Sequence, residues 1–262
     1  MILEVRELSF SYGKSEALKN VSLGLSAGEI LCVMGPNGSG KSTLIDSIMG
    51  IHKPASGSIL LSGRELRSYS RQELARQASY VPQNHSVTFP YTVREAVMMG
   101  RTAYVSAFGE PPESDGVFAE DAMKRVGISE LADKSYGGIS GGELRLVLLA
   151  RALCQGSPLM LMDEPTAHLD YRNELRFLET VRSLAIEDGK AVLISTHSPV
   201  HAFYFASRGV PTGAIFLKKG AVAARGEPDD IITAELLEEV YGVRARILES
   251  DGEKTVLLQN SL

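Results

Sequence analysis

A glycine-rich run near the start of the chain has the pattern of a phosphate-binding loop. It reads Gly35-Pro36-Asn37-Gly38-Ser39-Gly40-Lys41-Ser42-Thr43 and fits G-x-x-x-x-G-K-[ST]. In such a loop, backbone N–H groups and the start of the following helix bind the oxygens of a nucleoside triphosphate. We expect Lys41 to contact the terminal phosphates and the Ser42 hydroxyl to ligate Mg²⁺.

The flanking residues give this motif the context that it needs. The apolar run Glu29–Met34 predicts a buried strand before the loop, and apolar residues at helical spacing predict a helix after it, ending at Gly50. Glycines at 35, 38 and 40 are expected to let the main chain approach the phosphates, because a side chain would hold them away.

Two carboxylates follow a second apolar run and form the other half of a possible hydrolytic site. The run Leu159–Met162 predicts a strand, and Asp163 and Glu164 follow it. Asp163 suits the Mg²⁺ shell, and Glu164 suits a general base that polarises an attacking water. Taken alone, an acidic pair after a strand is equally consistent with the polar start of a loop.

Polar residues also end two other predicted strands. His197 follows Ile194-Ser195-Thr196, at the sheet edge where doubly wound sheets bind ligands, and could contact both the γ-phosphate and Glu164. Gln83 follows Val81-Pro82, and its amide oxygen could join the Mg²⁺ shell.

The remaining histidines and the cysteines lack such settings. His52, His85 and His201 are predicted to be surface residues. Cys32 and Cys154 lie in apolar segments and are predicted to be small core residues rather than a disulfide or a metal pair.

A second set of small residues, Ser140-Gly141-Gly142-Glu143, precedes a long apolar helix pattern. It could be an anion site at a helix N-terminus or simply an N-cap serine before a flexible loop. One nucleotide cannot obviously fill two phosphate sites in one chain. If this site faces outward, the γ-phosphate held by a second copy could fill it.

The elements that position these residues indicate an α/β fold with a mostly parallel sheet. Strands are expected at Ile2–Phe10 and Leu18–Leu25 around a turn at Gly13-Lys14, and again near Val81, at 159–162 and at 191–195, with helices between them.

From about residue 85 to 157 the pattern becomes helical. A capping box at Thr92-Val93-Arg94-Glu95 opens one helix, and Phe118–Val126 and Leu144–Cys154 predict two more. We therefore expect an α/β core formed by 1–84 and 158–262, with a helical insert at 85–157.

Composition excludes several classes. The chain has 262 residues and a net charge of −5, which argues against nucleic-acid binding. No apolar run approaches the length of a membrane span, and no leader is visible at the start. A cytoplasmic location is expected.

Taken in this order, the motifs resemble those of the ATPase subunit of ATP-binding cassette transporters, over essentially the whole chain. The matching segments are Walker A at Gly35–Thr43, the glutamine loop at Gln83, the signature at Ile139-Ser140-Gly141-Gly142-Glu143, Walker B at Leu159–Asp163 followed by Glu164, the aspartate loop at Ala167-His168-Leu169-Asp170, and the switch histidine at His197. Tyr12 matches the aromatic residue that stacks on adenine.

The resemblance implies ATP and Mg²⁺ as cofactors and a head-to-tail homodimer. Each ATP would lie between one Walker A loop and the partner's signature, so that Ser140, Gly141 and Gly142 act in trans. It also implies a P-loop NTPase core with an N-terminal antiparallel β subdomain and an inserted helical subdomain. The chain would lie at the cytoplasmic face of the membrane, bound to transmembrane permease subunits, with a solute-binding protein as a further partner.

The permease would dock on residues near Asn84–Thr92 and Ala103–Gly109, although the same residues could equally be core of the insert. Four segments resemble those of importers of iron chelates, haem, cobalamin or metal oxyanions. They lie around Thr92–Glu95, Met99–Arg101, His168–Asp170 and Leu237–Val243.

The departures are Ile139 for leucine and Glu143 for glutamine in the signature, and Ser198 for the aspartate that often follows the switch histidine. The alternative is a soluble cassette ATPase of a cofactor-assembly machine. A P-loop GTPase is disfavoured because the chain lacks an Asn-Lys-x-Asp motif.

Overall fold

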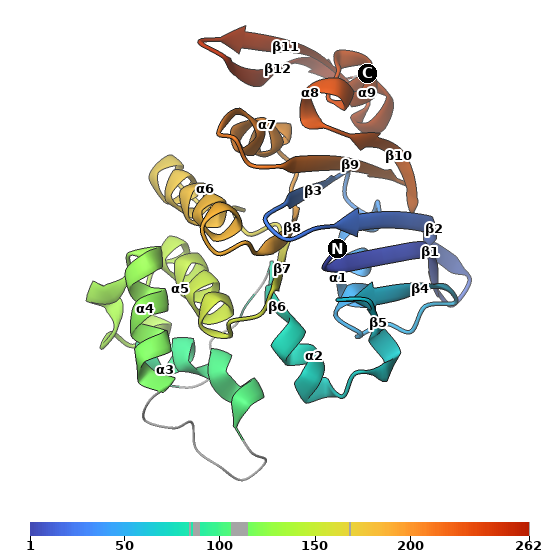
Figure 1. The fold of residues 1–262 in the computed structure, drawn as a ribbon. Coiled ribbons are helices and arrows are strands. Elements are labelled where there is room, and N and C mark those ends of the chain that lie inside the picture. The colour runs from blue at the N-terminus through green and yellow to red at the C-terminus, as the bar shows by residue number, and fades with distance from the viewer. Residues whose placement is uncertain (84, 86–89, 106–114, 168, 262) are drawn as a thin grey trace.

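A six-stranded sheet with the order β10-β9-β3-β8-β7-β6 forms the centre of the fold (Figure 1). The computed structural model describes residues 1–83, 85, 90–105, 115–167 and 169–261. The strands are β3 (Ile30–Met34), β6 (Ala78–Val81), β7 (Leu159–Asp163), β8 (Ala191–Ser195), β9 (Thr212–Lys218) and β10 (Ala221–Gly226). All neighbours pair in parallel except β9 and β10. The predicted α/β class with a mostly parallel sheet is thus confirmed.

A four-stranded antiparallel sheet, ordered β2-β1-β4-β5, lies to one side of it. Its strands are β1 (Leu3–Tyr12), β2 (Ser15–Leu25), β4 (Ser56–Leu61) and β5 (Arg64–Glu65). The predicted turn joins β1 to β2 at Gly13, whose φ of 59° is left-handed. Strands β4 and β5 were not among the strands expected from the sequence.

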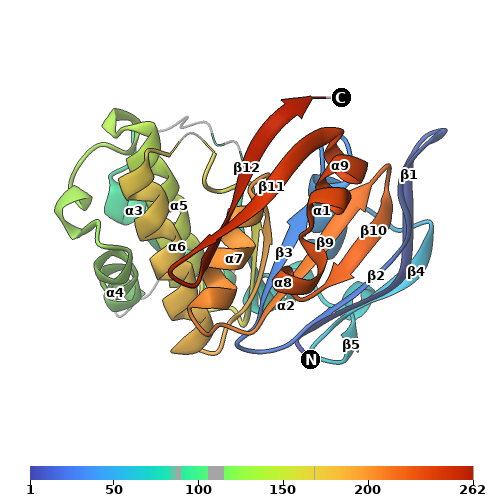
Figure 2. The same cartoon turned by 90° about the horizontal axis from the view of Figure 1, so that it is seen from above.

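Helices cover both faces of the parallel sheet. Those outside residues 85–157 are α1 (Lys41–Ile48), α2 (Arg71–Gln77), α6 (Tyr171–Ile186), α7 (Pro199–Ser207), α8 (Pro228–Ile231) and α9 (Ala234–Tyr241). Figures 1 and 2 show α6 and α7 on one face of the sheet, with α1 and the antiparallel sheet on the other.

The described elements between residues 85 and 157 are helical. They are α3 (Val93–Met98), α4 (Gly116–Val126), α5 (Gly141–Cys154) and short 3-10 segments at Met99–Tyr104, Ser129–Leu131 and Tyr136–Gly138, with another 3-10 segment outside this region at Leu66–Ser68. The capping box at Thr92 and Glu95 is present, because each side chain accepts a hydrogen bond from the other residue's backbone N–H. These helices gather at one end of the molecule (Figure 1).

Alternation along each central strand creates two cores. In β3, Ile30, Cys32 and Met34 belong to the core that also contains residues of α5, α6 and α7, whereas Leu31 and Val33 belong to the core formed with α1 and the antiparallel sheet. Successive side chains of a strand point to opposite faces, so a strand covered on both faces must be apolar throughout. Strands β7 and β8 divide their residues in the same way. Both cysteines are buried and free, as predicted.

A hairpin of β11 (Val243–Ser250) and β12 (Glu253–Ser261) forms a third sheet, which was not expected from the sequence. It packs β12 against α7 and β11 against α9 (Figure 2). The turn at Asp251-Gly252 has φ values of 54° and 78°, the geometry that favours Asp-Gly in two-residue hairpins. That dipeptide was the signal that could have revealed it.

Candidate nucleotide-binding site

The phosphate-loop motif lies between β3 and α1, as its sequence predicts. Gly40 is the N-cap of α1 with φ 109°, and Lys41 is the first helical residue. The Lys41 side chain is buried, and its Nζ donates to the carbonyl oxygens of Gly35 at 2.8 Å and Pro36 at 3.3 Å. Burial lowers the pKa of Lys41, and the nearby Glu164 carboxylate acts in the opposite direction.

The glycines of the loop have more than the predicted role. A Cβ at Gly35 would lie 2.2 Å from the Leu217 carbonyl oxygen, and one at Gly40 would lie 2.7 Å from that of Ala17. These two glycines are therefore required by close packing against neighbouring strands, and the explanation based only on phosphate access was incomplete for them. At Gly38 nothing lies within 4 Å of such a Cβ, and the constraint is its φ of 75°.

A cavity of about 370 Å³ opens above this loop and brings together several predicted site residues. Its lining includes Tyr12, Lys41, Ser42, Gln83 and Glu164. Segments far apart in the sequence, from β1, the phosphate loop and the ends of β6 and β7, thus meet at one place.

Glu164 is the residue where the polar contacts of this site converge. Its Oε2 accepts from Gln83 Nε2 at 2.7 Å, and its Oε1 lies 2.6 Å from His197 Nε2 and 3.4 Å from Lys41 Nζ. Its φ is 44°, a left-handed conformation that is uncommon outside glycine. The Glu164 N–H donates to the backbone and side-chain oxygens of Ser195, which hold this conformation.

Asp163 lies beside Glu164 but faces a different partner, as alternation along the strand predicts. Its side chain is buried, and Oδ1 accepts from Ser195 Oγ at 2.6 Å. The residues proposed for Mg²⁺ (Ser42, Gln83 and Asp163) offer hydroxyl, amide and carboxylate oxygens, the hard donors that this ion prefers. In the phosphate loop, the buried Ser39 hydroxyl lacks a hydrogen-bond partner among the described residues, as expected for a loop suited to a polar ligand.

Tyr12 is 52% exposed at the edge of the cavity, with a ring available for stacking. Its hydroxyl lies 2.7 Å from His52 Nε2, and the His52 ring stacks on Phe10 with centroids 4.6 Å apart. His52 was predicted to be an ordinary surface residue, yet it is half-buried and holds the tyrosine. Nothing local in the sequence links these positions.

The structure does not place the signature residues in this cavity. Ser140 is the N-cap of α5, where its side chain accepts from the Glu143 N–H and the Glu143 carboxylate accepts from the Ser140 N–H. Within one chain the N-cap interpretation of Ser140 therefore applies. Gly141 is exposed, whereas a Cβ at Gly142 would lie 2.9 Å from Asn173 Nδ2 of α6.

Of the aspartate loop, Asp170 is the N-cap of α6 and accepts from the Asn173 N–H at 2.8 Å. His168 lies outside the described residues, as do Asn84, 86–89 and 106–109 of the expected docking segments.

The prediction for His201 was wrong. It is 4% exposed, and both ring nitrogens are hydrogen-bonded, Nδ1 to Thr196 Oγ1 and Nε2 to Glu174 Oε1. His201 lies on α7 four residues before Phe205, which is fully buried, so both belong to the inner face of the helix. That spacing was the signal that could have identified it.

Two further residues contact the site without having been predicted. The Tyr241 hydroxyl, at the end of α9, accepts from the Gly35 N–H at 3.0 Å, and burial raises the pKa of Tyr241 to about 12. Arg145 of α5 donates to the Pro82 carbonyl oxygen at 3.0 Å, next to Gln83.

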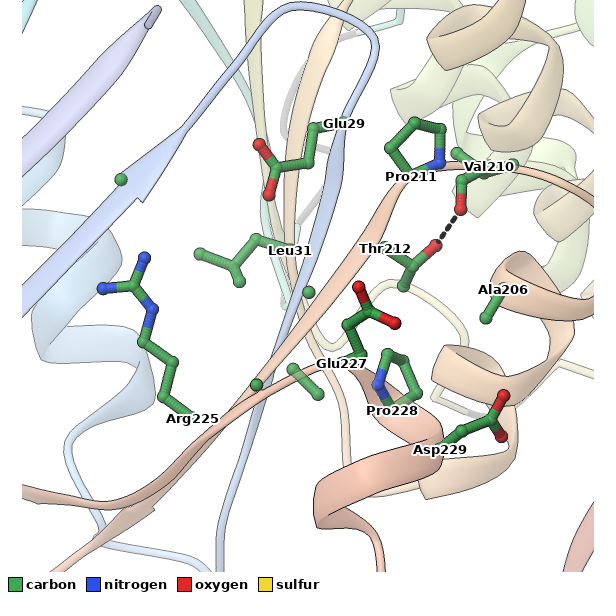
Figure 3. A pocket seen from close by; sticks show the side chains of 14 residues that line it. Glu29, Leu31, Ala206, Val210, Pro211, Thr212, Arg225, Glu227, Pro228 and Asp229 are labelled. Atoms are coloured by element: carbon green, nitrogen blue, oxygen red, sulfur yellow. Dashed lines mark hydrogen bonds between the residues drawn. The ribbon is translucent and has the colours of Figure 1, made fainter.

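Another cavity, of about 520 Å³, lies at the amino ends of β3 and β9, away from the phosphate loop (Figure 3). Its polar lining includes Glu29, Arg225 and Glu227. Asp229 is already paired with Lys254 at 2.8 Å. None of the predicted site residues lines it.

Comparison with known proteins places this site in a family. The family model described as ABC transporter matches residues 18–167. The hemin import ATP-binding protein of Thermobifida fusca is 37% identical over 248 residues, covering 95% of this chain and 84% of its own. The ferric enterobactin transport ATP-binding protein of Escherichia coli is 33% identical over 256 residues, covering 98% and 93%.

Solved structures agree. An ABC transporter assigned to the metal-chelate type, in an inward-facing conformation, has a chain with TM-score 0.86 and 29% identity, covering 99% of this chain and 98% of that one. A dimeric bacterial ABC transporter cassette has TM-score 0.76 and 28% identity, covering 87% and 99%.

The chain therefore belongs to the ABC transporter family, as one of its ATP-binding proteins. It is an ATPase. Among the described residues, no helix is both long and apolar enough to span a bilayer.

Proposed function

We propose that the chain is the ATP-hydrolysing subunit of an importer for an iron chelate, haem, cobalamin or a similar metal-containing solute. The names of its relatives support this class of cargo, since they denote hemin import, ferric enterobactin transport and cobalamin import. In this proposal the chain lies at the cytoplasmic face of the membrane, is bound to permease subunits and receives its solute through a solute-binding protein.

The observation that carries the ATPase site is the position of Glu164. Its carboxylate meets the amide of Gln83, the ring of His197 and the ammonium of Lys41 at the edge of the phosphate-loop cavity. A carboxylate so placed can orient and polarise a water, and general-base catalysis contributes about 10²–10⁴-fold. His197 holds the carboxylate in position, and Lys41 supplies positive charge for the phosphates.

Magnesium, when bound, would neutralise phosphate charge, and Ser42, Asp163 and Gln83 would hold it. Tyr12 would stack on the adenine, where one such contact is worth about 1–3 kcal/mol.

We further propose that two copies pair head to tail. The position of Ser140 to Gly142 outside the chain's own cavity supports this arrangement, because these residues would then contact the nucleotide of the partner. A two-fold pair is self-complementary and forms two equal sites.

A complementation experiment tests the pairing. Chains carrying Ser140→Arg and chains carrying Lys41→Ala should each be inactive alone, because every homodimeric site lacks one half. In the mixed dimer one site combines an intact phosphate loop with an intact signature. An equimolar mixture should therefore recover roughly a quarter of wild-type hydrolysis if the sites act independently. A mixture as inactive as its components would exclude the trans arrangement.

A further inference from the structure

The imidazole of His201 is buried between helix α6 and the turn that follows β8. Its residue is 4% exposed, with Nδ1 2.8 Å from Thr196 Oγ1 and Nε2 2.7 Å from Glu174 Oε1. Buried polar groups are retained where their hydrogen bonds are satisfied, and here both ring nitrogens have a partner. The contacts join α7 to α6 and to the end of β8.

The directions of these hydrogen bonds follow from the partners. The Glu174 carboxylate can only accept when ionised, so Nε2 carries the proton and donates to it. In the neutral imidazole Nδ1 is then the acceptor, and the Thr196 hydroxyl donates to it. The oxygen of that hydroxyl remains free to accept, and it does so from the Ser198 N–H at 3.0 Å.

These hydrogen bonds hold the turn that carries His197. Thr196 and Ser198 flank His197 on either side, and the hydrogen bond between them closes the turn that carries it. The Thr196 N–H donates to the Val33 carbonyl oxygen, which ties the turn to β3. His197 itself has a 43% exposed side chain, so its own packing does little to fix the contact with Glu164.

Glu174, the partner of His201 on α6, lies close to the aspartate loop and to the signature. Glu174 is in the first turn of α6, and its N–H donates to the carbonyl oxygen of Asp170. In the same turn, Asn173 packs against Gly142 so closely that a Cβ at Gly142 would overlap it. The start of α6 therefore touches both the signature helix and, through His201, the turn of His197.

From this geometry we infer that His201 is a positioning residue for the hydrolytic reaction. Through Thr196 it holds the turn of His197 so that His197 stays in contact with Glu164. Through Glu174 it anchors that turn to α6. The inference rests on the proposed role of His197 in ATP hydrolysis. His201 contacts no reacting group, and it acts only through the residues that it holds.

A matched pair at Thr196 tests the contact with little change in shape. Thr196→Val removes the hydroxyl and keeps the branched side chain, whereas Thr196→Ser keeps the hydroxyl. We expect Thr196→Val to lower kcat about tenfold, as for a small misplacement of a catalytic group, with the KM for ATP within about twofold of wild type. Thr196→Ser should restore most of kcat. Thr180→Val controls for the loss of a buried hydroxyl, since the Thr180 hydroxyl donates to the Arg176 carbonyl oxygen within α6.

A second set tests whether the effect passes through His197. His201→Phe should lower kcat in the wild-type chain and should cause no further loss in a His197→Ala chain. Equal fractional losses in both backgrounds, or a Thr196→Val variant with wild-type kcat, would overturn the inference. The proposed function fails separately, if His197→Ala alone leaves hydrolysis unchanged.

Discussion

The backbone of Glu164 is held in a left-handed conformation by two hydrogen bonds to Ser195. Such conformations outside glycine cost about 1–3 kcal/mol and persist where neighbouring contacts enforce them. Here the conformation directs the carboxylate away from Asp163 and toward Gln83, Lys41 and His197. At the residue scale, the site depends on this one turn after β7.

Replacing Glu164 with glutamine should separate binding from hydrolysis. The amide keeps the size of the side chain but cannot accept a proton, so ATP binding should persist while turnover falls about 10²–10⁴-fold. ATP-bound dimers should accumulate, visible by size-exclusion chromatography with light scattering. Glu249→Gln, on an exposed part of β11, is the control. Wild-type turnover by the Glu164→Gln chain would rule out its role as the base.

The two cysteines should be inert in the folded chain. Burial raises the pKa of Cys32 to about 12 and that of Cys154 to about 11, so both remain thiols at pH 8. The thiolate is the reactive form. A maleimide or iodoacetamide label should therefore react with neither residue until urea unfolds the protein, as mass spectrometry would report. Rapid labelling of either native cysteine would contradict its burial.

At the scale of the elements, local signals were the ones that the sequence could supply. The phosphate loop, the capping boxes at Thr92 and Ser140, and the central strands β3, β7 and β8 each depend on a few adjacent residues, and each was predictable. Strand β9 has an equally plain apolar run at Ala214–Leu217 and was also predictable, although it was not among the expected strands. The hairpin of β11 and β12 is half-exposed, so its hydrophobic pattern is weak, and only Asp251-Gly252 marks it.

Truncating a buried side chain of the central strand β7 should show how much the alternating apolar pattern contributes to stability. Leu161 of β7 is fully buried in the core shared with α1, and Leu161→Ala should lower the free energy of unfolding by about 2–5 kcal/mol. Leu175→Ala, at a residue 46% exposed on α6, should change it by less than about 0.5 kcal/mol. Urea denaturation followed by circular dichroism measures both. Equal effects would mean that β7 does not form this core.

At the scale of the whole molecule, the site depends on contacts between segments that no local pattern relates. His52 meets Tyr12, His201 meets Glu174, and Arg145 meets Pro82, across separations of tens of residues. Residue types predicted that Glu164 and His197 could cooperate, but they could not reveal which side chains hold them. In the proposed head-to-tail pair, the signature of the second copy would complete each site, so a single copy would not contain the whole of the proposed site.

If the chain is an importer subunit, it should be recovered with membranes. A tagged chain carrying Glu164→Gln, expressed from its own genetic context and extracted with mild detergent, should co-purify with a multi-span membrane protein. The untagged strain controls for background. Recovery only in the soluble fraction, associated with soluble assembly proteins, would favour the cofactor-assembly alternative.

The hydrogen bond from the Gly35 N–H to the Tyr241 hydroxyl means that the last turn of α9, just before the hairpin of β11 and β12, holds the phosphate loop. A chain truncated before α9 would keep every recognisable ATPase motif but would lose this hydrogen bond. A fragment chosen for its motifs alone would therefore contain every recognisable motif, yet its phosphate loop would be held less firmly when it binds nucleotide.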